Sequence, residues 1–180
     1  MTLSYEIAAG ATDSASRMER AQLEAELERL HAASFGWALG CCGRRRDDAE
    51  EVLQTVYLKV LDGKARFDGR SSLKTWLFSV IRRTALAHRR TQWMRSLAML
   101  RVPVPHDDHD AERDSIRSEE ASRLAVALVK LARRQREVLE LVFYHDMTIE
   151  EAGVTLQISV GSARVHYTRG KKRLEALLHE

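Results

Sequence analysis

The sequence predicts an all-α fold of two small helical domains joined by a flexible acidic linker. Glycine and proline are scarce, with 9 and 2 copies in 180 residues, although hairpin-rich β folds need both at their turns. Apolar residues instead recur every three or four positions, which is the period of amphipathic helices. Both prolines, Pro103 and Pro105, lie in one acidic segment, and we expect the linker there, over residues 96–117.

The first domain is expected at residues 16–95, after a disordered tail at residues 1–15, which have no helical period. A capping-box pattern at its start predicts a helix that runs to about residue 39, and Gly40 and Gly43 are expected to end it.

The next predicted helix, residues 47–62, has the clearest amphipathic period, and acidic residues crowd its first turns, where the helix dipole favours negative charge. A turn at residues 67–72 ends in a serine that can cap the following helix, expected at residues 73–92. The distal half of that helix carries four arginines, which is more than compensation of the helix dipole requires.

The second domain is expected at residues 118–180 and ends in a predicted helix-turn-helix. A second capping box, Thr148 to Glu151, precedes a short helix to Leu156. A three-residue turn and a helix from Val160 to about residue 178 complete the spacing. One face of this last helix is apolar or small, so its other face is expected to present polar donors, as a recognition helix does.

The basic residues gather in two blocks. Residues 63–101 contain ten Lys or Arg and one acid, and residues 156–174 carry a net charge of +5 without any acid. Between them, residues 102–120 carry a net charge of −5. Two basic blocks around an acidic bridge indicate two contact surfaces for a polyanion, and nucleic acid is the expected partner.

Several classes of function find no support in the sequence. The side chains of the adjacent Cys41 and Cys42 diverge on a helix, so we expect buried thiols rather than zinc ligands. His106 and His109 lie in a proline-broken segment without a rigid frame, so no metal site is predicted, and neither a cofactor nor a catalytic residue. Without a secretory signal or an apolar run that could span a bilayer, we expect a cytoplasmic protein without membrane insertion.

Three segments, in their order and spacing, resemble bacterial RNA polymerase sigma factors. They are residues 48–54 (DAEEVLQ), residues 67–77, and the stretch from Leu131 through Arg136 into the helix-turn-helix. The resemblance is to the small extracytoplasmic-function (ECF) group of the sigma-70 family, which keeps only regions 2 and 4. It implies that the first domain is region 2 and the second is region 4.

The resemblance implies an alternative sigma factor, which binds core RNA polymerase, directs it to −35 and −10 promoter elements and helps to open the DNA. Its implied partners are the clamp helices of the largest polymerase subunit, the flap of the second largest subunit, promoter DNA and an anti-sigma factor. The residues it places at the polymerase are Asp48, Glu50, Glu51, Gln54 and Tyr57. Those at the −10 element are Phe67, Arg70, Lys74, Trp76, Arg82, Arg83, Arg89 and Arg90. Those at the −35 element are Ser162, Arg164, Val165, Thr168, Arg169, Lys171 and Lys172.

The sequence departs from the family pattern in both domains. Arg83 and Ala87 stand where the family often has Asn and Asp, and the recognition helix differs over residues 162–166, so a known promoter sequence cannot be transferred. Gln157 stands at a turn position that usually holds glycine, which a left-handed backbone would favour. The alternative is a stand-alone helix-turn-helix regulator, but residues 16–92 are basic at the wrong end for its ligand domain or dimer surface.

Overall fold

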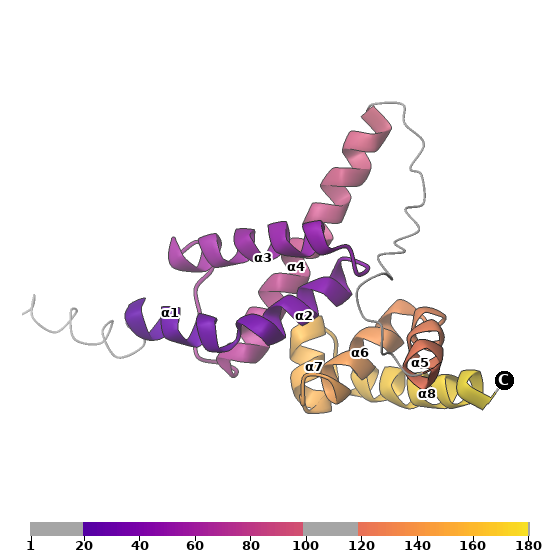
Figure 1. Ribbon diagram of the computed structural model, residues 1–180. Coiled ribbons are helices and arrows are strands. Elements are labelled where there is room, and N and C mark those ends of the chain that lie inside the picture. Colours follow the sequence, from indigo (N-terminus) through magenta and orange to yellow (C-terminus); the bar gives the residue numbers. More distant parts are fainter. Residues whose placement is uncertain (1–19, 99–118, 180) are drawn as a thin grey trace, which may run out of the picture.

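The computed structural model describes residues 20–98 and 119–179, and all regular elements in these ranges are α-helices (Figure 1), which confirms the predicted fold class. The first half contains α1 (Arg20–Arg29), α2 (His31–Cys41), α3 (Arg46–Leu61) and α4 (Leu73–Ala98). The second half contains α5 (Glu119–Val129), α6 (Arg133–Phe143), α7 (Ile149–Leu156) and α8 (Val160–His179). The predicted tail, the first capping box, the two linker histidines and all but the start of the linker lie outside the described residues.

The helix boundaries follow the periodic patterns, with three differences. The first predicted helix is interrupted at Leu30, so that it forms α1 and α2. Gly40 lies inside α2 instead of ending it, and the helix ends one residue later, before Gly43 and Arg44, which have positive φ angles of 68° and 64°. The third difference is that α4 continues to Ala98, beyond its predicted end near residue 92.

In the first half, α2, α3 and α4 pack around Trp37. This side chain is fully buried, and its indole ring stacks on Phe78 of α4 with 5.9 Å between the ring centroids. The indole N–H donates a hydrogen bond to the Phe78 carbonyl at 3.0 Å, so the ring is buried without an unsatisfied donor. The predicted apolar face of α3 covers the same core with Ala49, Val52, Leu53, Val56 and Val60.

The two halves share one hydrophobic core. Buried side chains of the second half belong to the same cluster as Trp37 and Phe78, and they are Val138, Leu141, Met147, Ala152 and Leu156. Figure 1 shows α6 and α7 against α2 and the lower part of α4. The described domains are therefore packed together, an arrangement that the separate amphipathic patterns of the two halves did not predict.

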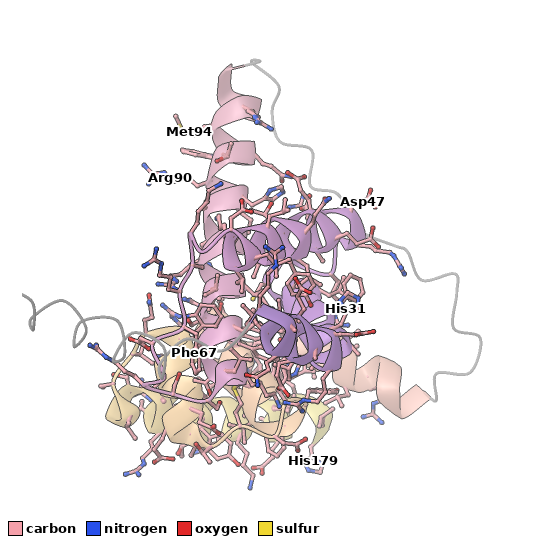
Figure 2. All side chains as sticks on the ribbon, turned by 90° about the vertical axis from the view of Figure 1, so that its left-hand side faces the viewer. His31, Asp47, Phe67, Arg90, Met94 and His179 are labelled. Carbon is pink, nitrogen blue, oxygen red and sulfur yellow. The ribbon has the colours of Figure 1, made fainter. Side chains whose placement is uncertain are left out.

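The upper part of α4 extends beyond the packed helices (Figure 1). Its first three turns are buried from Leu77 to Arg82, whereas Arg89 and Arg90 are exposed. Figure 2 shows Arg90 and Met94 on this projecting part, and Met94 is 54% exposed. The arm formed by residues 86–98 therefore presents its basic side chains to solvent.

No helix within the described ranges is long and apolar enough to cross a membrane.

Replacement of Trp37 should test whether its ring holds the core together. We expect Trp37→Ala to lower the free energy of unfolding by about 3–5 kcal/mol, because a large aromatic side chain is removed from a packed site. Urea unfolding followed by circular dichroism measures this loss. The control is Tyr144→Ala, at a side chain that is 62% exposed, where we expect a change within about 0.5 kcal/mol. Equal losses in the two variants would contradict the central role of Trp37.

Candidate nucleic-acid and protein interfaces

An apolar groove lies on the outer side of α2 and α3. It is lined by His31, Phe35, Arg46, Glu50, Leu53, Gln54, Tyr57, Leu58 and Leu61. Leu58 is 55% exposed, and the Tyr57 hydroxyl lies 3.2 Å from Nδ1 of His31. Exposed apolar side chains within a polar rim are typical of a protein-binding surface. Of the residues predicted to contact the polymerase, Glu50, Gln54 and Tyr57 line this groove, and Glu51 is exposed on the same helix.

Asp48 lies apart from this groove, inside the fold. It is only 9% exposed, and its carboxylate forms an ion pair with Arg45. The same carboxylate accepts a hydrogen bond from Gln92 at 2.9 Å and lies 3.3 Å from Nε2 of His88. Asp48 thus joins α3 to α4, whereas the sequence placed it among the exposed partner contacts. The spacing of His88 and Gln92 on one face of α4 was the only signal of this role.

An aromatic pair lies at the lower end of α4. The rings of Phe67 and Trp76 are both half-buried, with 5.5 Å between their centroids. The Ser72 hydroxyl accepts a hydrogen bond from the Thr75 N–H at 3.2 Å, which confirms the predicted serine cap. Arg70 beside this turn is exposed and pairs with Asp68. Partly exposed rings next to a cation can stack on an unpaired base.

The predicted −10 residues do not all reach the surface. Arg83, Arg89 and Arg90 are exposed, but Arg82 is 4% exposed and its guanidinium lies 3.3 Å from Glu137 of α6. Lys74 is half-buried and donates a hydrogen bond to the carbonyl of His145, in the loop after α6. In this conformation, Arg82 and Lys74 therefore contact the second half of the chain. Charge patterning could not reveal this, because their partners are distant in the sequence.

The predicted helix-turn-helix is formed by α7 and α8. The Thr148 hydroxyl accepts a hydrogen bond from the Glu151 N–H at 3.1 Å, and the Glu151 carboxylate accepts one from the Thr148 N–H at 2.9 Å. This confirms the capping box. Gln157 adopts the left-handed conformation, with φ 56° and ψ 48°. The Ser159 hydroxyl then accepts a hydrogen bond from the Ser162 N–H at 3.1 Å and caps α8.

The outer face of α8 presents the predicted −35 residues. All seven are exposed, whereas Ala163 and Gly170 are buried on the opposite face. The Arg164 guanidinium pairs with Glu150 of α7 at 2.8 Å, a contact that sequence reasoning missed because it joins two helices. A helix with arginine and lysine outside and small residues inside can lie in a DNA major groove.

The two cysteines are free and buried, as predicted. Burial raises the pKa of Cys42 to about 11 and raises that of Cys41 well above its ordinary value. Both thiols therefore stay protonated, whereas nucleophiles and metal ligands act as thiolates. In the parts of the chain that the structure describes, no group of three or more His, Cys, Asp and Glu could hold a metal ion.

These surfaces define a helical protein with a helix-turn-helix half and a second half that presents basic and aromatic side chains. Residues 27–95 match the family model of sigma-70 region 2, and residues 121–174 match that of sigma-70, region 4. The chain is 30% identical over 152 residues to the ECF RNA polymerase sigma factor SigF of Caulobacter vibrioides. This alignment covers 81% of this chain and 77% of SigF. It is 28% identical over 150 residues to the ECF RNA polymerase sigma factor SigX of Bacillus subtilis, which covers 75% of each chain. The chain belongs to the ECF group of the sigma-70 family, whose members are alternative sigma factors that direct RNA polymerase to promoters.

Two solved structures share the fold. The sigma factor RpoE from Bartonella quintana, in complex with the anti-sigma factor NepR, aligns with a TM-score of 0.71 and 23% identity over 87% of this chain and 96% of that one. CnrH, in complex with the cytosolic domain of CnrY, aligns with a TM-score of 0.61 and 24% identity over 94% of each chain. The match to sigma-70 region 2 leaves the alternative of a stand-alone regulator without support.

The left-handed turn residue offers a test of local strain. We expect Gln157→Gly to raise the free energy of unfolding by about 0.5–1 kcal/mol, because glycine removes the steric cost of this conformation. Gln157→Ala keeps the Cβ atom and should bring no gain. Urea unfolding of both variants makes the comparison. A glycine variant no more stable than the alanine variant would show that the turn is not strained.

Proposed function

We propose that the groove on α2 and α3 docks on the clamp helices of the largest subunit of RNA polymerase. The observation that carries this proposal is the row of exposed apolar and polar side chains on one helix, with Leu58 inside the groove and Glu50 and Gln54 along it. Glu51 is exposed beside the groove, and its carboxylate lies 3.6 Å from Nδ1 of His88 on α4. The apolar centre supplies the buried area of such a contact, and the charged rim supplies its register.

The lower end and the arm of α4 are proposed to hold the melted −10 element. Phe67 and Trp76 offer a half-exposed aromatic surface, and Arg83, Arg89 and Arg90 offer phosphate contacts along the same helix. Stacking of one base on an aromatic ring contributes about 1–3 kcal/mol. The protein thus stabilises the open strand by binding it.

The exposed face of α8 is proposed to read the −35 element. Arg164 lies near the N-terminus of α8, the end whose residues contact base edges in a helix-turn-helix, whereas Lys171 and Lys172 lie further along and suit the phosphates. Glu150 holds the Arg164 guanidinium before DNA binds. The flap of the second largest polymerase subunit is the proposed protein partner of this half. An anti-sigma factor is a further proposed partner. The structure of RpoE contains the anti-sigma factor NepR, and that of CnrH contains the cytosolic domain of CnrY.

Charge reversal tests the docking surface. Glu51→Lys with Gln54→Ala should leave the circular dichroism spectrum unchanged, since both side chains are exposed. Its affinity for core polymerase should fall at least about tenfold, or 1.4 kcal/mol, because a charge at the interface is reversed. The matched control is Glu28→Lys, which makes the same charge change at an exposed position on α1 that does not line the groove. Unchanged binding of a folded double variant to core polymerase would refute this docking site.

Two substitutions on α8 separate base reading from phosphate contact. Arg164→Ala should relax the preference at one −35 position, because an arginine that binds one guanine with two hydrogen bonds discriminates by about 1–3 kcal/mol. Lys172→Ala should instead weaken all promoters about equally. Transcription from a randomised promoter library with reconstituted holoenzyme measures both. A wild-type base preference in the Arg164→Ala holoenzyme would leave Arg164 with a phosphate contact only.

A further inference from the structure

A polar cavity of about 360 Å³ lies where the end of α2, the arm of α4 and the first turns of α6 come together. Four arginines line it, one from the loop after α2, one from α4 and two from α6. They are Arg45, Arg89, Arg133 and Arg136. Cavities of this size hold small molecules, and guanidinium groups are the donors that proteins most often use for phosphates and carboxylates. The lining therefore indicates an anion as the ligand.

Two of these arginines have no carboxylate partner. Among the residues that the structure describes, the Arg89 side chain forms neither a hydrogen bond nor an ion pair, and Arg136 donates only to the carbonyl of Val129, at 3.3 Å. Arg89 comes from α4 and Arg136 from α6, so two uncompensated positive charges lie on different walls of the cavity. An anion between them can accept charge-assisted hydrogen bonds from both sides.

The other two arginines are already held in position. Arg45 forms an ion pair with Asp48 and donates a hydrogen bond to Gln92 at 3.2 Å. Arg133 donates to the Glu137 carboxylate at 2.9 Å. Since a guanidinium group carries five N–H donors, both side chains keep donors for a ligand. Their fixed positions lower the entropy that binding costs.

Two glutamates also line the cavity, but neither opposes an anion strongly. Glu137 is 6% exposed and accepts hydrogen bonds from three arginines, so its charge is balanced. The three donors are Arg82, Arg133 and Arg134. Burial raises the pKa of Glu140 to about 7, so this carboxyl group is partly protonated at neutral pH. A protonated carboxyl group can donate a hydrogen bond to an anion oxygen.

We propose that this cavity binds a small diphosphate, which is either inorganic pyrophosphate or the diphosphate group of a nucleotide. A diphosphate can offer one phosphoryl group to Arg89 on α4 and the other to Arg136 on α6, whereas a single carboxylate presents both of its oxygens to one side. The planar guanidinium fork matches phosphate oxygens in pairs. A cavity of about 360 Å³ is too small for a DNA duplex, whose major groove alone is about 12 Å wide. The site is therefore distinct from the proposed promoter contacts.

Isothermal titration calorimetry of the full chain tests the site with sodium pyrophosphate and with ADP as probes. We expect one pyrophosphate per chain, bound at least about tenfold more tightly than citrate, a tricarboxylate that lacks the paired phosphoryl groups. Tighter binding of ADP would identify a nucleotide as the ligand, and tighter binding of pyrophosphate would identify the free anion. Several weak sites per chain, or equal affinities for pyrophosphate and citrate, would overturn the proposal. Since neither polymerase nor DNA is present, failure of the proposed polymerase or promoter contacts leaves this outcome unaffected.

Three variants locate the bound anion. Arg89→Gln and Arg136→Gln should each lower the pyrophosphate affinity at least about tenfold, because each removes a charged donor from one wall. Arg136→Lys keeps the charge without the planar fork, so its loss should be measurable but smaller than that of Arg136→Gln.

The matched control is Arg90→Gln, which makes the same change at the next residue of α4, an exposed position that does not line the cavity. Its pyrophosphate affinity should equal that of the wild type, and circular dichroism checks that every variant is folded. Equal losses in Arg89→Gln and Arg90→Gln would reveal a general attraction of anions to the basic arm and would refute a defined site.

Discussion

Trp37 lies where α2, α3 and α4 meet the loop between α6 and α7, and its ring touches Phe78 on one side and His145 on the other. Because an indole ring is large and rigid, the helices around it can take few relative positions. The hydrogen bond from its N–H to the Phe78 carbonyl fixes the orientation of the ring as well. The same side chain thus organises the core of the first half and forms part of the surface on which the second half packs.

A buried cluster of charged groups near Trp37 also defines how the two halves pack against each other. Glu137 accepts hydrogen bonds from Arg82, Arg133 and Arg134, so its charge is well paired. A buried ion pair adds little net stability, because its attraction must first offset the loss of hydration. Such contacts define one relative geometry of the two halves at a modest net gain in free energy.

The packing of the two halves leaves some proposed interfaces accessible and covers others. The groove on α2 and α3, the arm of α4 and the outer face of α8 all face solvent. Arg82 and Lys74, by contrast, are held by Glu137 and by the His145 carbonyl. A partner that docks on the outer groove can therefore approach the protein in this conformation, whereas Arg82 and Lys74 contribute little to the exposed basic surface of α4.

Local patterns in the sequence determined most of the secondary structure. The amphipathic period of residues 47–62 predicted that one face of α3 is buried, and the capping box at Thr148 and the expected helix start at Val160 agree with where α7 and α8 begin. The exposed face of α8 also followed from its period. These predictions succeeded because the side-chain direction on a helix depends on residues within one or two turns.

Only the tertiary structure decided which charges stay exposed. The sequence pattern does not distinguish Asp48 from Glu51, yet the Asp48 carboxylate is buried against His88 and Gln92. Nor does it distinguish Arg82 from Arg83, yet Arg82 is buried against Glu137. Likewise, two amphipathic halves did not indicate one shared core. The physical reason is that an ion pair or an apolar contact depends on which distant surfaces meet, and the period of a helix carries no information about its partner.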